Sequence, residues 1–380
     1  MGKQTTRLPR PLWIRRAGCL TAAVLAAAAL AACSTATAGS SSAKGCGTAA
    51  NAPAPPAGAD TSYYCGKTIT FIVDDAAGSE NDLYFQAVKP YVQKYLGATV
   101  KAQYYPGSAV VGSNKTATAA SDGLTIGDLD INFSLNQIFN ATHAEVFDVS
   151  KLSWVFVYKP DAYLIVSCKN SPYKTIAQAL ASTKTVTLLD IPSGGGNEIL
   201  HFLMAAYGTP HKYITGYSGG NALGAGCLRG DGDITIGAPS DFLTSAGNAM
   251  DPGETPLLLS TSIPAGSSNS FLNAAAPTFA QFFKQQPVTA ALGQQAQQLA
   301  LSTFNSGIEG GFAGPPGIPQ ARLLALRAAF TYAALQPDVE KKWSDLGIAP
   351  GITANAADAD SYATTKLQQA TDIEKILKMP

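Results

Sequence analysis

Residues 185–238 read TVTLLDIPSGGGNEILHFLMAAYGTPHKYITGYSGGNALGAGCLRGDGDITIGA, and their pattern decides the fold class. Three short runs rich in β-branched and apolar residues, 185–191, 211–217 and 232–238, are each typical of a strand. Between them, residues 197–208 and 221–230 have apolar residues at helical spacing. Strand and helix therefore alternate, which predicts parallel strands with helices packed on their faces.

The same alternation extends in both directions from this stretch. We expect further strands at residues 68–74, 98–105, 124–131, 153–158, 163–168 and 255–262. We expect further helices at residues 81–97, 114–121, 175–183, 290–302, 320–335 and 337–347. Two such sheets, joined by paired crossings of the chain, would form a bilobed protein with a cleft suited to a small molecule.

The amino-terminal segment indicates export. It has five basic residues and no acidic one before Cys33, and an apolar run rich in alanine ends at that cysteine. This is the pattern of a secretory signal, so we expect residues 1–32 to be a signal peptide. The run is too short to favour a permanent membrane span. Leu30 to Cys33 resemble a bacterial lipobox, which predicts a lipid on Cys33 and a place on the outer face of the cell membrane; a plain cleaved signal is the alternative.

The charge balance argues against a nucleic-acid partner. Without the signal, 21 basic residues stand against 26 acidic ones. The remaining chain is thus mildly acidic and lacks the basic footprint of nucleic-acid-binding proteins. Any membrane attachment would come from the lipid.

Small residues, proline and glycine dominate residues 34–60, so we expect residues 33–66 to be a flexible tether. Beyond Cys33 the chain has four cysteines, and an even number in an exported chain favours disulfides. Of the three possible pairings we favour Cys46 with Cys65, at the edge of the tether, and Cys168 with Cys227, within one later lobe. Free buried thiols are the alternative.

Two motifs suggest chemistry that the rest of the sequence does not support. GYSGG at residues 216–220 has the form of a serine-hydrolase elbow around Ser218. That arrangement needs a histidine after the serine, and all three histidines precede it: His143, His201 and His211. DLDIN at residues 128–132 opens like a calcium loop but lacks its later glycine and glutamate. We therefore expect no catalytic residue, no metal and no cofactor. The tripeptide RGD at residues 229–231 is interpreted as a turn.

Three loops share one design. The first loop (residues 74–82, DDAAGSEND), the middle loop (191–198, IPSGGGNE) and the third loop (216–221, GYSGGN) each follow a strand and precede a helix. Glycine lets the backbone present its N–H groups, and a helix N-terminus adds partial positive charge, so such loops can hold a carboxylate. Each loop could also be an ordinary turn with a helix cap. Three loops at strand ends favour an anion site.

These loops belong to a longer resemblance. ITFIVDDAAGSEND (69–82), PGSAVVGSNKTATAASDGLTIG (106–127), YSGGNALGAGCLRGDGDI (217–234) and PDVEKKWSDLGIAP (337–350) occur in an order and spacing similar to those of one family. Four shorter segments between these stretches also match the family: LNQIF, FDVSKLSWVFVY, APTFAQ and GPPGIP. From about Lys67 onward, the sequence resembles the extracytoplasmic solute-binding receptors of the tripartite tricarboxylate transporter, the TctC or Bug family.

The resemblance implies an α/β fold of the two-lobed, type II periplasmic-binding-protein kind. Each lobe would be a mixed or parallel sheet flanked by helices, with the ligand cleft between the lobes. The lobe boundaries would be 67–156 for the first part of lobe 1, 157–256 for lobe 2, and 257–380 for the return to lobe 1. The receptor would be a monomer that delivers an organic acid to a membrane permease. The implied ligand contacts are Gly78, Ser79, Asn81, Asp82, Ser193, Gly194, Gly195, Gly196, Asn197, Gly219, Gly220 and Asn221.

The sequence departs from the family in the first loop. Asp74, Asp75 and Glu80 stand where relatives have apolar or small residues. A like charge about 6 Å from a bound carboxylate costs roughly 2 to 3 kcal/mol at an effective dielectric constant near 20. A tricarboxylate is thus disfavoured if these acids face the cleft; otherwise they point to solvent or meet a polar group of the ligand. A secreted hydrolase using Ser218 and a sensor module without a transporter are the alternative functions.

Overall fold

The computed structural model describes residues 46, 47, 49, 51–106, 109–130, 147–158, 163–191, 197–243, 250–260, 276–285, 310–346, 365, 368 and 372. The chain divides into two compact units, 1–42 and 43–380. The first unit lies outside the described residues, and the second contains two five-stranded sheets. Within the described ranges, no helix is both long and apolar enough to cross a membrane.

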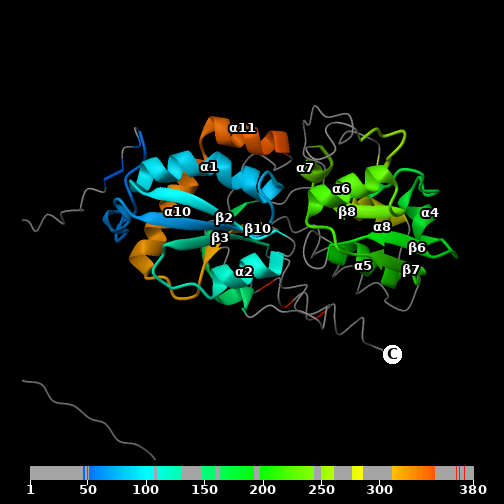
Figure 1. Cartoon of the computed structure of the whole chain (residues 1–380), viewed down its shortest axis with the longest axis horizontal. Coiled ribbons are helices and arrows are strands. Elements are labelled where there is room, and N and C mark those ends of the chain that lie inside the picture. Colours follow the sequence, from blue (N-terminus) through cyan, green and yellow to red (C-terminus); the bar gives the residue numbers. More distant parts are fainter. Residues whose placement is uncertain are drawn as a thin grey trace, which may run out of the picture. The chain divides into compact units, whose positions relative to one another are not determined.

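The first sheet has the strand order β2-β1-β3-β10-β4 (Figure 1). Its central strand β1 (Thr68–Val73) pairs in parallel with β2 (Thr99–Tyr104) and β3 (Thr125–Asp130). The strand β10 (Gly310–Gly314) lies antiparallel between β3 and β4 (Ser153–Tyr158). The carboxyl ends of β1, β2 and β3 therefore lie at one edge of this sheet, where the first loop begins.

Among the described residues, four α-helices accompany the first sheet, and an apolar core that contains several aromatic rings joins three of them to it. They are α1 (Glu80–Leu96), α2 (Ala109–Ala117), α10 (Gln320–Ala334) and α11 (Pro337–Leu346). In the core, the ring of Phe71 on β1 stacks on that of Phe85 on α1, with centroids 4.0 Å apart, and meets Phe312 of β10 edge-on at 5.0 Å. Such ring pairs add to the free energy of apolar burial. We call this sheet with its helices the first lobe.

The second sheet has the order β7-β6-β8-β5-β9. Here β6 (Val186–Leu189) is parallel to β7 (His211–Ile214) and β8 (Ile234–Gly237), whereas β5 (Leu164–Ser167) is antiparallel to both β8 and β9 (Leu257–Ser260). The accompanying helices are α4 (Ile176–Leu180), α5 (Asn197–Ala206), α6 (Gly220–Arg229), α7 (Pro239–Leu243) and α8 (Phe279–Gln285). This second lobe has a separate apolar core that includes Leu203, Ile236 and Phe283.

The predicted α/β fold with two sheets is confirmed, and the expected lobe boundary at residue 257 is wrong. The strand β9 begins at that residue and pairs with β5 of the second sheet, and α8 buries its phenylalanines in the second core. The second lobe therefore continues to at least Gln285. The apolar run of β9 predicts a strand but does not specify which sheet it joins. The helix expected at 290–302 lies outside the described residues.

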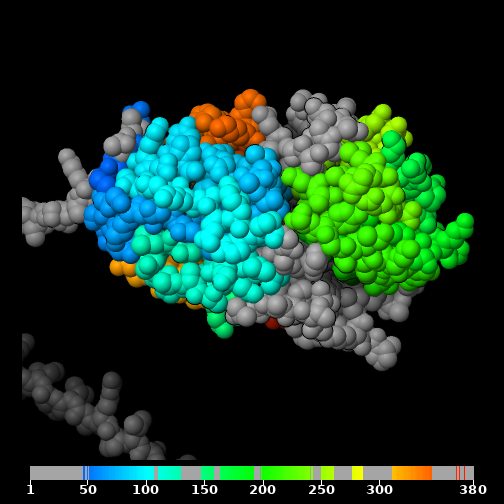
Figure 2. Space-filling model, viewed as in Figure 1, coloured from blue at the N-terminus to red at the C-terminus, as the bar shows by residue number. Residues whose placement is uncertain are grey.

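The expected flexible tether is also corrected. From Cys46 on, its described part is packed on the first lobe, as Figure 2 shows for the blue segment beside the cyan surface. The Tyr95 hydroxyl donates to the carbonyl of Pro53 at 3.3 Å, and the Asp60 N–H donates to the carbonyl of Ala321 at 2.9 Å. Small residues are enough to hold this segment in place, because Ala49, Ala52 and Ala59 pack against the core of the first lobe. The segment does not need a core of its own.

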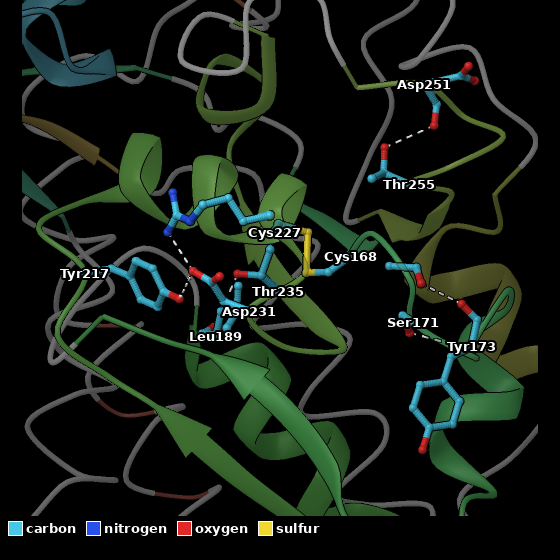
Figure 3. Close-up of a disulfide and its surroundings, with 12 residues drawn as sticks. Cys168, Ser171, Tyr173, Leu189, Tyr217, Cys227, Asp231, Thr235, Asp251 and Thr255 are labelled. Atoms are coloured by element: carbon cyan, nitrogen blue, oxygen red, sulfur yellow. Dashed lines mark hydrogen bonds and ion pairs between the residues drawn. A yellow bond between two sulfur atoms is a disulfide. The ribbon is translucent and has the colours of Figure 1, made fainter.

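Both predicted disulfides are present. Cys46 is bonded to Cys65, close to the start of β1, and Cys168 is bonded to Cys227. The second bond joins the end of β5 to the last turn of α6 (Figure 3). Both of its cysteines are fully buried. The predicted pairing of neighbours along the chain is thus confirmed, and the free-thiol alternative is excluded.

Candidate functional site

The first loop leads from β1 into α1 and is held by Asp82. Ser79 caps the helix, since its hydroxyl accepts the Asp82 N–H at 3.4 Å. The Asp82 carboxylate in turn accepts the N–H of Gly78 at 2.8 Å and the hydroxyl of Tyr104 at 3.0 Å. Gly78 has a φ of +81°, which favours glycine. Asp82 is thus a buried residue that fixes the shape of the loop.

The two consecutive acids of the first loop differ in their surroundings. Asp74 is 3% exposed, accepts the Asn81 side-chain amide at 2.8 Å and the Ser113 hydroxyl at 3.4 Å, and packs against Gly112 of α2. Asp75 accepts the N–H of Ala76 at 2.6 Å. Neither acid is a fully solvated surface residue, because Asp74 is buried and Asp75 is half-buried.

The third loop meets the first. The Asn221 side-chain amide lies 3.5 Å from the carbonyl oxygen of Gly78, and the Asp75 carboxylate lies directly beside Gly219. A Cβ at Gly219 would come within 2.5 Å of the Asp75 Oδ1 atom, so any larger residue would displace this carboxylate. The structure therefore brings together two of the three predicted loops, one from each lobe.

A second carboxyl group adjoins this contact. Asp241 of α7 lies so close to Gly220 that a Cβ there would overlap its carboxylate. Burial, together with the negative charges of Glu80 and Asp75, raises the pKa of Asp241 well above its usual value, although the N–H of Ala238 donates to it at 2.9 Å. Burial also raises the pKa of Asp75. The junction of the loops thus carries two carboxyl groups whose pKa values are raised by burial.

The middle loop follows β6, whose carboxyl end lies at the same sheet edge as those of β7 and β8. Its residues Ser193, Gly194, Gly195 and Gly196 lie outside the described residues. Asn197 is the first residue of α5 and is 3% exposed. The participation of the middle loop in the site therefore stays a prediction.

Sequence reasoning missed Asp241. It lies on the five-residue helix α7, which is too short to give a hydrophobic period, and only the fold brings it to Gly220. The single local signal was the sequence PSDF after a strand, which is typical of a helix start.

The two described histidines contact residues other than Ser218. The Nε2 atom of His201 lies 3.2 Å from the Asp190 carboxylate, and the Nδ1 atom of His211 lies 2.7 Å from the carbonyl oxygen of Thr209. His143 lies outside the described residues. In the ranges that the structure covers, no group of three histidine, cysteine or acidic residues could hold a metal ion.

Comparison with known proteins identifies the fold. No family model matches the sequence, and no curated protein matches it. Among solved structures, the periplasmic binding protein BugD matches with a TM-score of 0.66 and 16% identity, over 83% of this chain and 98% of BugD. MatC from Rhodopseudomonas palustris, with bound malate, gives 0.65 and 16% over 81% of this chain and 99% of MatC. A further R. palustris protein, with adipate, gives 0.62 and 14% over 82% and 97%.

The TM-scores of 0.62 to 0.66 establish the fold, and the match covers nearly the whole of each solved structure. The chain has the two-lobed α/β fold of the periplasmic solute-binding proteins of the Bug and TctC type.

Proposed function

We propose that this chain is an exported solute-binding receptor of the Bug and TctC family, which captures a small carboxylated solute between its two lobes. The observation that carries the proposal is the contact of the first and third loops, in which Asn221 of one lobe reaches Gly78 of the other. Similar proteins with malate and adipate support the class of solute. Closure of the lobes on the solute would populate the form that a transporter recognises.

The proposed binding residues come from the three loops. The first loop contributes Gly78, Ser79, Asn81 and Asp82, of which Asp82 acts by holding the loop. The third loop contributes Gly219, Gly220 and Asn221, and the middle loop contributes residues 193–197. The Oδ1 atom of Asn221 is buried and has no hydrogen-bond partner in the described part of the chain. An amide oxygen accepts hydrogen bonds, so it suits a hydroxyl or a protonated carboxyl of the solute.

The acids at the junction restrict the solute. Asp75 lies against Gly219, and Asp241 against Gly220, so an anionic solute bound there meets carboxyl groups of the protein. Each ionised acid about 6 Å away would cost roughly 2 to 3 kcal/mol. A monocarboxylate or a dicarboxylate with one remote charge fits this arrangement better than a tricarboxylate such as citrate.

The proposal also covers the setting of the receptor. The signal pattern before Cys33 supports export, and a lipid on Cys33 would hold a monomeric receptor at the outer face of the cell membrane. The partner would be a permease of the tripartite tricarboxylate type, to which the closed form delivers the solute.

A thermal-unfolding screen tests the proposal. The full chain with Cys33→Ser, which cannot be lipidated, is heated with mono-, di- and tricarboxylates and with neutral and cationic solutes. A solute present at 100 times its dissociation constant adds about 2.7 kcal/mol to the free energy of unfolding. We expect mono- or dicarboxylates, malate and adipate among them, to raise the melting temperature more than citrate does. A shift with a neutral or cationic solute alone would contradict the carboxylate assignment.

A further inference from the structure

The carboxyl end of α6 is held by its capping hydrogen bonds, by a disulfide and by a backbone hydrogen bond from Lys169. The Asp231 N–H donates to the carbonyl of Gly226 and the Gly230 N–H to that of Cys227, each at 3.1 Å, while Gly230 has a left-handed φ of +80°. This is a Schellman motif. The disulfide with Cys168 holds the same turn, and the Lys169 N–H donates to the carbonyl of Cys227 at 2.9 Å. Asp231, which directly follows the turn, therefore has a well-determined backbone position.

The side chain of Asp231 is held as well. Its Oδ2 atom lies 2.6 Å from the Arg229 guanidinium. This ion pair and the hydroxyl of Tyr217 lower the pKa of Asp231. The carboxylate is thus ionised at neutral pH and is a strong hydrogen-bond acceptor.

Tyr217 connects this anchor to the third loop. Its hydroxyl donates to Asp231 Oδ2 at 3.0 Å, as Figure 3 shows. Its ring lies across α6 at Gly226, where a Cβ would come within 2.7 Å of the ring. The loop before α6 is thus tied back to the turn after α6, and Gly219 follows Tyr217 by two residues.

We propose that Tyr217, Arg229 and Asp231 act together as a clamp that positions Gly219, Gly220 and Asn221 for solute binding. The inference rests on the proposed function and names positioning residues for that site. It also gives one account of two sequence motifs, because Tyr217 belongs to GYSGG and the other two residues to RGD. Arg229 and Asp231 bind each other, so the tripeptide does not display two separate charges.

The chain offers a matched control for the Tyr217 hydroxyl. Tyr91 of α1 donates to Asp338 Oδ1 at 2.6 Å, and Lys342 lies 4.0 Å from the other oxygen of that carboxylate. This is also an exposed Tyr–Asp hydrogen bond beside a cation, but it joins α1 to α11 instead of a site loop. Tyr217→Phe and Tyr91→Phe each remove one hydroxyl and leave the ring.

The first experiment measures affinity for the best solute of the screen, in the full chain with Cys33→Ser. Loss of one hydrogen bond changes an equilibrium by about 3- to 10-fold. We expect Tyr217→Phe to weaken solute binding by that factor and Tyr91→Phe by less than about twofold, with similar melting temperatures for the two ligand-free variants. We expect the double variant Asp231→Asn with Tyr217→Phe to bind the solute as tightly as the single variant with the lower affinity. Both substitutions break the same clamp, so their effects should not add. Equal affinities of the two tyrosine variants, or additive losses, would overturn the proposal.

The second experiment needs no solute and separates this inference from the proposed function. Amide hydrogen exchange reports local opening of the backbone. We expect Tyr217→Phe to speed exchange at residues 219–223 by about 3- to 10-fold relative to Tyr91→Phe. If the screen finds no carboxylate ligand and the loop still opens in Tyr217→Phe, the function proposal fails and the clamp stands. If exchange at residues 219–223 is unchanged, the clamp is wrong.

Discussion

The carboxyl groups of Asp74 and Asp75 are neighbours in the chain and have different partners. Because they follow a strand, their side chains point in different directions. Asp74 binds Asn81 and Ser113 inside the first lobe, whereas Asp75 faces Gly219 of the second lobe. Of these two acids, only Asp75 is therefore placed to influence which solute binds.

A matched pair of substitutions tests this difference. Asp75→Asn removes a negative charge at the junction, so we expect tighter binding of a dicarboxylate by about tenfold and a smaller gain for a monocarboxylate. Asp74→Asn weakens internal hydrogen bonds, so we expect loss of about 1 to 2 kcal/mol of stability with unchanged selectivity. Titration calorimetry and urea unfolding measure the two effects. Unchanged selectivity in Asp75→Asn would show that this acid does not face the solute.

The pKa of Asp241 predicts a pH dependence of stability. Burial and the charges of Glu80 and Asp75 raise this pKa in the folded state, so the folded protein binds the proton more tightly than the unfolded chain. The stabilisation is complete below the unfolded pKa, near 4, and is lost as pH rises through the folded pKa. The loss reaches at most about 1.4 kcal/mol per pH unit for this group.

Urea unfolding of wild type and Asp241→Asn between pH 4.5 and 8 measures the effect. We expect the difference in free energy of unfolding to change in favour of the variant as pH rises, because the variant has no carboxyl to deprotonate. The carboxyls with lowered pKa, such as that of Asp231, act in the opposite sense but are common to both proteins. Parallel pH profiles would contradict the raised pKa.

At the scale of elements, the sequence predicts which segments are helices or strands better than it predicts which strands pair in a sheet. The strands β1, β6 and β8 and the helices α1, α5 and α10 were predictable because their apolar periods are long or clear and helix caps such as Ser79 mark an end. The strand β10 was not predicted, because GGFAG has few β-formers and is a strand only through its neighbours β3 and β4. Likewise β9 was expected as a strand but assigned to the wrong lobe, because sequence does not encode the partner of a short apolar run.

The site follows the same division. Gly78, Ser79, Asn81 and Asp82 were predictable as a helix-start loop, and the resemblance implied ligand contacts in both the first and the third loop. The sequence did not predict that the Asp82 carboxylate accepts the Gly78 N–H. It also did not predict that Asp241 lies beside Gly220. Both depend on side-chain contacts fixed by the fold rather than by local pattern.

At the scale of the whole molecule, the two disulfides serve different lobes. Cys46–Cys65 holds the amino-terminal segment on the first lobe, and Cys168–Cys227 holds α6 in the second. Their sequence separations of 19 and 59 residues correspond, by loop entropy, to stabilisation of about 3 and about 4 kcal/mol. The two bonds are therefore expected to stabilise the protein by similar amounts, although they lie in different lobes. Removing each in turn can separate an effect on stability from an effect on binding.

Serine variants of each pair separate stability from binding. We expect Cys46→Ser with Cys65→Ser, and Cys168→Ser with Cys227→Ser, to lower the free energy of unfolding by similar amounts, about 3 to 4 kcal/mol. Only the second pair should also weaken solute binding at temperatures where both variants are folded, because it frees the helix that presents Asn221. Equal affinities of the two double variants would show that the disulfide does not support the site.

The position of Cys65 also determines how the protein would respond to a pull from its amino-terminal side. Tension arriving at Cys46 passes through the sulfur–sulfur bond to Cys65 and reaches β1 next, so residues 47–64 carry no load. The contacts of Pro53 and Asp60 with the first lobe are spared. In the reduced protein the same tension would run through those residues and peel them from the lobe before it reached the sheet.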